Sequence, residues 1–287
     1  MQFQGLGKPA AGIVFDSDMG ESIDTALALA MLCGFQGKSA ARVVSISVSK
    51  PNLKAAAFCD ALARFYGGEP GPFSPPVSIG MADNGPAPDD TAMLLAVAAK
   101  FPGKVQRQID TADPVTLMRN ALTAQYDQNA SVVLAGPATN LARLLDLAGA
   151  RELIQKKVKL LAIAEARLDR DPAAAKRVVA EWPTPMVMAG AALGEALPFP
   201  GACIEKDFAW SPAHPIVEAY RAYKPMPYDA PSWAMTAALY AAKPQEKYFG
   251  VVKDKLELDA EQKERVIQVY TEMASAKPVP RTRGRRG

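Results

Sequence analysis

The chain contains 287 residues, of which 49% are hydrophobic and 22% are charged, and its formal net charge at pH 7 is +3. These values are ordinary for a soluble globular protein with a full core, and the small net charge gives no sign of a nucleic-acid-binding surface. Uninterrupted apolar windows of ~18 residues are absent from the sequence, so we expect no transmembrane helix and no membrane partner.

The chain ends and the cysteines add further limits. Four arginines between residues 281 and 286 carry much of the positive excess, and the Gly and Pro around them predict a disordered basic tail at 276–287, after one domain spanning 1–275. Cys33, Cys59 and Cys203 show neither a paired disulfide framework nor metal-ligand spacing. The N-terminus lacks a basic region followed by an apolar one, so we expect no signal peptide and a cytoplasmic location.

Short β-rich runs alternate with helical ones over most of the chain. The expected strands are Gly12–Phe15, Arg42–Val48, Val77–Gly80, Ser131–Ala135, Val158–Ala164 and Pro185–Ala189. The expected helices are Ile23–Cys33, Leu53–Tyr66, Thr91–Lys100, Pro114–Tyr126, Thr139–Leu147 and Asp171–Trp182, followed by two more around Pro212–Tyr223 and Ser232–Ala242. This alternation predicts an α/β fold with a mostly parallel open sheet flanked by helices.

The first expected strand brings two aspartates to its carboxyl end. In GIVFDSDMGESIDTALALA (12–30), Asp16 and Asp18 follow the apolar run and Asp24 lies at the start of the next helix. The spacing places the side chains of Asp16 and Asp18 on the same side of an extended chain, and open α/β sheets bind ligands outside the carboxyl ends of their strands. We therefore expect a site for a hard cation or for acid–base chemistry. The simpler alternative is capping of the following helix by Asp18 or Ser22.

A D-x-D pair after a strand also occurs in phosphatases. That chemistry would favour Thr or Val two residues after the second aspartate, where this chain has Gly20. It would also need a lysine and a second acidic pair after later strands, whereas Asp89 and Asp90 fall in an expected loop. The phosphatase interpretation therefore ranks low.

Four segments resemble, in the same order, motifs of the inosine–uridine-preferring nucleoside hydrolases. DSDMGESIDTALALAMLCG (16–34) resembles their N-terminal D-T-D-x-G-x-D-x-D-D-A-L-A-L-A signature, and VVLAGPATNLARLL (132–145) resembles their G-P-L-T-N-L-A segment. AIAEARLDRDPAAAKRVV (162–179) is similar to E-F-N-x-x-x-D-P-E-A-A, and PSWAMTAALYAAKP (231–244) is similar to S-W-D-x-T-A-x-L-Y-A-x-x-P. The resemblance implies the α/β fold of that family and a homo-oligomer.

The resemblance also implies a reaction, the cleavage of the N-glycosidic bond between ribose and a base through an oxocarbenium-like transition state. In the family, a calcium ion holds the ribose and the attacking water. Carried over by motif, Asp18 is a calcium ligand and the general base, Asp16 supports the metal, and the main-chain carbonyl of Ala135 is a further metal ligand. The implied contacts to the ribose hydroxyls are Asp24, Glu165 and, from a loosely matching segment, Asn52.

The sequence departs from the family pattern at this same site. Thr25 and Ala234 stand where the family has calcium-binding aspartates, and Ser22 replaces another acidic residue. Because calcium affinity depends on the number and charge of its ligands, these changes should weaken calcium binding greatly. Glu21 or Asp229 are the candidates for a replacement oxygen.

Arg167 stands where the family has a ribose-binding asparagine. An inward guanidinium would lie near the cation position, so we predict that Arg167 lies within ion-pair reach of Asp18. Trp233, beside Ala234, is the best candidate among the three tryptophans to stack on a base, although tryptophans at helix ends are more often core anchors. His214, the only histidine, is expected at a helix start.

Two functional hypotheses remain. The first is a hydrolase that acts on a nucleoside or related N-riboside, with altered metal use. The second is a non-catalytic protein of the same fold that binds a nucleoside or another polyol.

Overall fold

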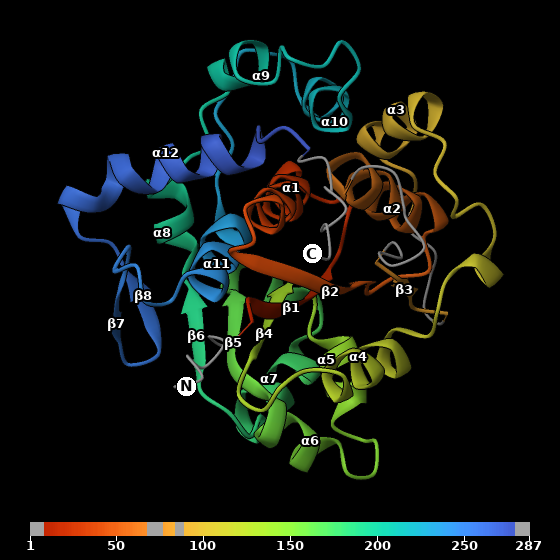
Figure 1. Ribbon diagram of the computed structural model, residues 1–287, viewed down its shortest axis with the longest axis vertical. Helices are drawn as coiled ribbons and strands as arrows, with labels where there is room; N and C mark the ends of the chain where they lie inside the picture. Colours follow the sequence, from red (N-terminus) through yellow and green to blue (C-terminus); the bar gives the residue numbers. More distant parts are fainter. Residues whose placement is uncertain (1–8, 68–76, 84–88, 279–287) are drawn as a thin grey trace, which may run out of the picture.

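The computed structural model describes residues 9–67, 77–83 and 89–278, so the predicted tail lies mostly outside the described residues. The strands form one eight-stranded sheet in the order β3-β2-β1-β4-β5-β6-β8-β7 (Figure 1). They are β1 Ala11–Ser17, β2 Ala41–Val48, β3 Ile79–Met81, β4 Ala130–Ala135, β5 Val158–Ala164, β6 Met186–Ala189, β7 Gly250–Val252 and β8 Lys255–Glu257.

The predicted mostly parallel sheet is confirmed. All pairs from β3 to β6 are parallel, β8 joins β6 through one parallel pair, and only β7 runs antiparallel to its neighbour. The central strands are continuous apolar runs because helices cover the sheet on both faces. In β1, Ile13 and Phe15 belong to the core on one face, and Val14 belongs to the core on the other.

Helices cover both faces of the sheet (Figure 1). One layer contains α4, α5, α6 and α7, and the other contains α1, α2, α3, α10, α11 and α12. The bounds are α1 Ile23–Gly37, α2 Leu53–Gly67, α3 Ala92–Lys100, α4 Pro114–Thr123, α5 Thr139–Leu144, α6 Ala150–Lys157, α7 Pro172–Glu181, α8 Ala191–Ala196, α9 Ala202–Lys206, α10 Pro215–Tyr223, α11 Trp233–Ala242 and α12 Lys263–Ala274, with 3-10 turns η1 Gln108–Asp110, η2 Glu165–Arg170 and η3 Ala260–Gln262.

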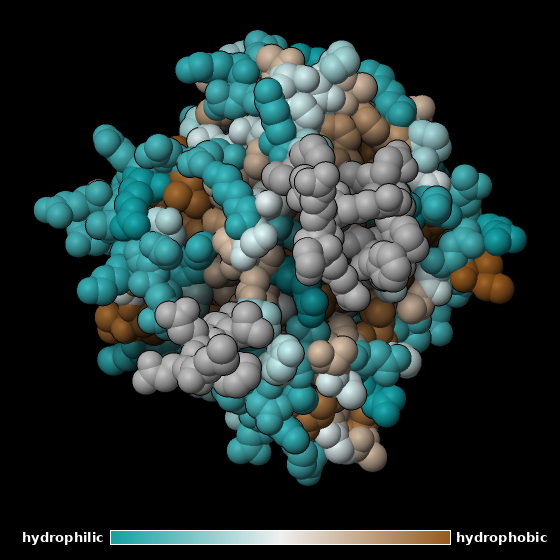
Figure 2. All heavy atoms as spheres, viewed as in Figure 1, coloured by the Kyte–Doolittle hydropathy of each residue, from teal (hydrophilic) through white to brown (hydrophobic). Residues whose placement is uncertain are grey.

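Within the described ranges, no helix combines the length and the apolar character needed to cross a bilayer. Figure 2 shows that hydrophilic side chains cover much of the viewed face and that apolar ones form small, separate groups.

The strand order reverses between β1 and β4. The chain passes outward from β1 to β2 and β3, then returns to the other side of β1 and continues outward through β4, β5 and β6. The connections on the two sides of this switch point diverge at the carboxyl ends of β1 and β4, which is where open α/β sheets bind ligands. The topology therefore places Asp16 and Asp18 at the expected binding position.

Several elements differ from the sequence-based expectations. The helices predicted to reach Tyr126 and Leu147 end at Thr123 and Leu144. The β7–β8 hairpin was not predicted, because its turn uses Lys253 and Asp254 at positive φ instead of the glycine that usually marks such turns. Helix α12 was also missed, although its buried Val266, Tyr270 and Met273 follow helical spacing.

His214 joins three helices of one layer. Its Nδ1 accepts the main-chain N–H of Ile216 at 3.1 Å and so caps α10. This confirms the prediction that His214 lies at a helix start. Its Nε2 lies 3.4 Å from the hydroxyl of Tyr66 in α2, and that hydroxyl donates to the carbonyl of Ala274 in α12. Because Nδ1 accepts, Nε2 carries the proton in this arrangement. The ring is 1% exposed, and burial lowers its pKa from 6.5 to about 3.

We predict that His214 makes the folded state sensitive to acid. The folded pKa is about 3 and the unfolded one 6.5, so the stabilisation is complete above pH 6.5 and is lost as the pH falls towards 3. Urea unfolding should be measured from pH 7.5 to 4 for the native chain and for His214→Asn, which keeps a capping oxygen but does not titrate. Below pH 6.5 the free energy of unfolding of the native chain should fall by up to ~1.4 kcal/mol more per pH unit than that of the variant. The prediction would be contradicted if the free energy of unfolding had the same pH dependence in the native chain and the variant.

Candidate functional site

The candidate site lies at the carboxyl ends of β1 and β4, with residues from β1, α1, η2 and β4. Asp16 is the penultimate residue of β1, Asp18 follows its end, and Asp24 lies in the first turn of α1. Arg167 comes from η2, directly after β5. Ala135 is the last residue of β4, where it is fully buried.

Gly136 allows β4 to approach the aspartates closely. A Cβ at this position would lie 2.5 Å from the main-chain nitrogen of Asp18 and 2.7 Å from the carbonyl carbon of Ser17. Only glycine can therefore follow Ala135 without moving the chain segment that carries Asp18. Within the sequence Ala-Gly-Pro at the end of this strand, Gly136 therefore has a packing role at the site.

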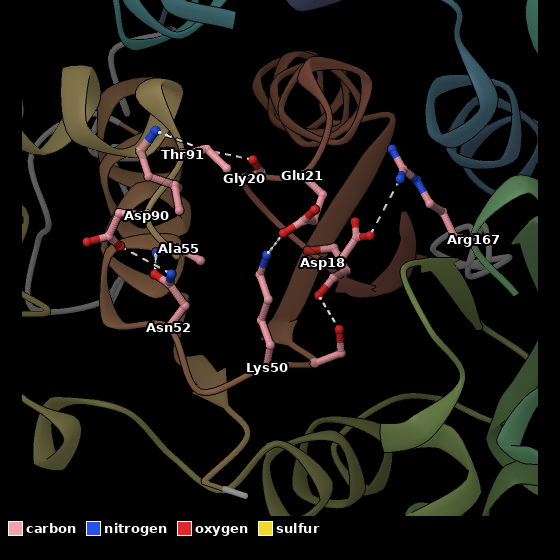
Figure 3. Close-up of polar contacts among 12 residues, drawn as sticks. Asp18, Gly20, Glu21, Lys50, Asn52, Ala55, Asp90, Thr91 and Arg167 are labelled. Atoms are coloured by element: carbon pink, nitrogen blue, oxygen red, sulfur yellow. Dashed lines mark hydrogen bonds and ion pairs between the residues drawn. The ribbon is translucent and has the colours of Figure 1, made fainter. Parts of the chain in front are cut away.

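The predicted ion pair between Asp18 and Arg167 is present (Figure 3). Arg167 Nη1 lies 3.8 Å from Asp18 Oδ2, and both side chains are buried. This distance indicates an ion pair rather than a hydrogen bond. The other carboxylate oxygen of Asp18, Oδ1, is buried and has no hydrogen-bond partner. Burial raises the pKa of Asp18, while the charges of Arg167 and Lys50 act in the opposite direction.

Asp16 is fully buried beside Asp18. Its Oδ1 accepts a hydrogen bond of 2.9 Å from the side-chain amide of Asn140 in α5, and its Oδ2 has no partner. Burial raises the pKa of Asp16 to about 8, despite the hydrogen bond from Asn140. Asp16 is therefore mostly protonated at neutral pH, which reduces the negative charge of the cluster.

Asp24 holds the start of α11. Its two oxygens accept the main-chain N–H groups of Ala234 at 2.6 Å and Met235 at 3.1 Å. Burial raises the pKa of Asp24 to about 7, although these two hydrogen bonds act to lower it. The sequence had no local signal for this contact, because its partners lie 210 and 211 residues away along the chain. The predicted contact of Asp24 with a ribose hydroxyl remains a prediction.

Ser22, the simpler capping candidate, does cap α1. Its hydroxyl accepts the main-chain N–H of Asp24 at 3.3 Å.

The two candidates for a replacement metal ligand, Glu21 and Asp229, also have partners. Glu21 pairs with Lys50, and this pairing lowers the pKa of Glu21 although burial alone would raise it. Asp229 accepts the N–H of Gly201 at 2.8 Å.

Asn52 and Glu165 have structural partners at the margins of the site. Asn52 Oδ1 accepts the N–H of Ala55 at 2.8 Å, which caps α2, and its amide donates to Asp90 at 3.2 Å (Figure 3). It lines a groove of about 490 Å³ between the start of α2 and the residues after α3. Glu165 is partly exposed and lies 3.4 Å from Lys255 Nζ. Their predicted contacts with ribose remain predictions.

Trp233 covers the guanidinium of Arg167. Arg167 Cζ lies 5.8 Å from the centroid of the Trp233 ring, a distance typical of a cation–π contact. The indole N–H donates to the carbonyl of Ala191 at 3.0 Å, which fixes the ring against α8. Trp182 is instead a core residue that is 7% exposed.

The donor set does not fit a calcium ion. Asp18 Oδ1, Asp16 Oδ2 and Thr25 Oγ1 are buried oxygens without partners, and even with the main-chain carbonyl of Ala135 they number only four, whereas calcium takes six to eight oxygen ligands. Both oxygens of Asp24 already accept main-chain N–H groups, and the Arg167 guanidinium lies next to Asp18. In the part of the chain that the structure describes, no group of three or more His, Cys, Asp or Glu side chains is arranged to hold one metal ion.

The architecture is the fold of the nucleoside hydrolases, so the resemblance found in the sequence motifs is confirmed at the level of the fold. An inosine–uridine-preferring nucleoside hydrolase from Bacillus anthracis has a TM-score of 0.66 and 14% identity, with 93% of this chain and 99% of that chain covered. An inosine–guanosine nucleoside hydrolase has a TM-score of 0.64 and 14% identity, with 92% and 99% covered. The type III effector XopQ, in complex with adenosine diphosphate ribose, has a TM-score of 0.61 and 13% identity, with 93% and 94% covered. No protein-family model and no curated protein matches the sequence.

We predict that removing the Asp24 carboxylate destabilises the fold strongly. Asp24→Ala leaves two buried N–H groups of α11 without acceptors, and each such loss costs about 1–3 kcal/mol. The matched control is Asp113→Ala, which removes an exposed N-cap that accepts the N–H of Thr116 at 2.7 Å and should cost only about 0.5–2 kcal/mol. Urea unfolding of both variants measures the difference. Equal losses would show that Asp24 is not an important anchor of α11.

Proposed function

We propose that this chain binds the ribosyl group of a nucleoside or related N-riboside and hydrolyses its N-glycosidic bond, with Asp18 as the general base. The observation that carries the proposal is a group of three buried oxygens without hydrogen-bond partners, Asp18 Oδ1, Asp16 Oδ2 and Thr25 Oγ1, at the ligand-binding edge of a nucleoside hydrolase fold. A buried acceptor that lacks a donor costs about 1–3 kcal/mol. A ribosyl hydroxyl would donate to Asp18 Oδ1, and ribosyl oxygens would accept from the protonated Asp16 and from the Thr25 hydroxyl.

The chemistry follows from the position and charge of Asp18. In hydrolysis, a water oxygen bonds to the anomeric carbon while the bond from that carbon to the base nitrogen breaks. The base nitrogen keeps the electron pair of this bond and takes up a proton from solvent, while Asp18 takes the proton released by the water and afterwards returns it to solvent. The guanidinium 3.8 Å away favours the ionised form of Asp18 that this step needs. The half-buried ring of Trp233 would offer a flat surface to the base.

A second candidate function is ribosyl binding without hydrolysis. It is favoured by the burial of Asp18, which raises the pKa of that carboxyl and so opposes the ionised form that a general base needs. One protein with this fold, XopQ, is described in complex with adenosine diphosphate ribose. A larger ribosylated molecule is therefore a reasonable ligand to test beside simple nucleosides.

We expect calorimetry to detect binding of ribonucleosides or adenosine diphosphate ribose, and release of the free base to detect hydrolysis. Asp18→Asn should reduce hydrolysis by about 10²–10⁴-fold, because it removes the general base, with a much smaller effect on binding. Asp127→Asn, a change at an exposed ion pair, should leave both unchanged. Binding without base release by the native chain would favour the second candidate. Absence of binding to every ribosyl compound would contradict both.

A further inference from the structure

The guanidinium of Arg167 is buried, although burying a charged group costs free energy. Its side chain is 10% exposed and that of Asp18 is 5% exposed, whereas most other ion pairs of the described residues lie on the surface. A buried arginine remains charged and requires a partner of opposite charge. Asp18 is that partner, so the pair belongs to the architecture of the site.

A chain of contacts sets the position of Arg167. The guanidinium lies over the ring of Trp233, and this ring is fixed by its hydrogen bond to Ala191. Gly194 in α8 makes room for the ring, because a Cβ there would lie 2.1 Å from Trp233 Cδ1. The guanidinium is therefore held by Trp233 as well as by Asp18 and does not depend on a ligand for its position.

Each buried carboxylate of the cluster has a donor or cation from the protein itself. Asp16 accepts from the amide of Asn140, Asp18 pairs with Arg167, and Asp24 accepts from the first N–H groups of α11. The N-terminus of α11 also carries the partial positive charge of its helix dipole. A divalent cation placed here would meet a fixed positive charge, and at Asp24 it would have to displace both donors.

We infer that Arg167 serves as the resident cation of the site, which holds Asp18 in place and excludes a divalent ion such as calcium. The assignment involves the same residues as the proposed function, but it holds whether or not the chain hydrolyses a riboside. Arg167 acts here as a positioning residue, through its charge on Asp18.

Calcium binding tests the exclusion directly. Calorimetric titration of chelator-treated native chain should show no binding up to millimolar calcium, and calcium should not shift its melting temperature. The variant with Thr25→Asp, Arg167→Asn and Ala234→Asp removes the guanidinium and adds two carboxylates beside Asp24, at residues that lie next to it in the chain or in space. It should bind calcium with a dissociation constant of about 10⁻⁴ M or tighter, and its melting temperature should rise with calcium and fall again with chelator.

A charge cycle tests the ion pair without any metal and covers the case in which the triple variant fails to fold. Arg167→Met and Asp18→Asn should each lower the melting temperature, and the double variant should lose less than the sum of the two losses. The matched control is Arg170→Met, on the same 3-10 turn, whose side chain is 56% exposed and lies 4.0 Å from Asp169. This control should melt within a degree or two of the native chain.

Three results would overturn the inference. They are calcium binding by the native chain that Asp18→Asn abolishes, a folded triple variant that binds calcium no better than the native chain, and additive losses in the charge cycle. None of these readouts measures hydrolysis, so a failure of the proposed function would leave them unchanged.

Discussion

The burial of three aspartates at one end of the central strand is the constraint on which the site depends. Asp16, Asp18 and Asp24 are at most 4% exposed, and an isolated carboxylate is far less stable inside a protein than in water. The chain compensates each in a different way, with a side-chain amide, a guanidinium and the N-terminus of a helix. These contacts tie α5 and η2 to the end of β1, and α11 to the first turn of α1.

The reversal of strand order makes this convergence possible. Because β2 and β4 lie on opposite sides of β1 and all three strands are parallel, the segments that follow them leave the sheet at the same edge. Gly136 then allows the end of β4 to lie against the main chain of Asp18. The fold thus fixes where a ligand would bind, while the side chains decide what the site can do.

The contrast with calcium chemistry follows from those side chains. A nucleoside hydrolase fold at 14% identity specifies the backbone framework but not the ligands of a metal. Here an alanine and a threonine stand beside Asp24, and an arginine faces Asp18. One fixed positive charge requires fewer carboxylates around it than a divalent ion. This agrees with the small number of acidic side chains at the carboxyl end of β1.

The sequence by itself determined the α/β class, the approximate positions of the first six strands along the chain and the position of the D-x-D pair at the end of β1, because apolar runs and helical spacing are local patterns. It also predicted that Arg167 reaches Asp18, through motif positions rather than through geometry. Only the tertiary structure decided that Asp24 holds α11, that Asn52 bonds to Asp90 as well as capping α2, and that Gly194 makes room for Trp233. These contacts join distant segments and depend on how the helices pack on the sheet, and packing leaves no periodic signal in the sequence.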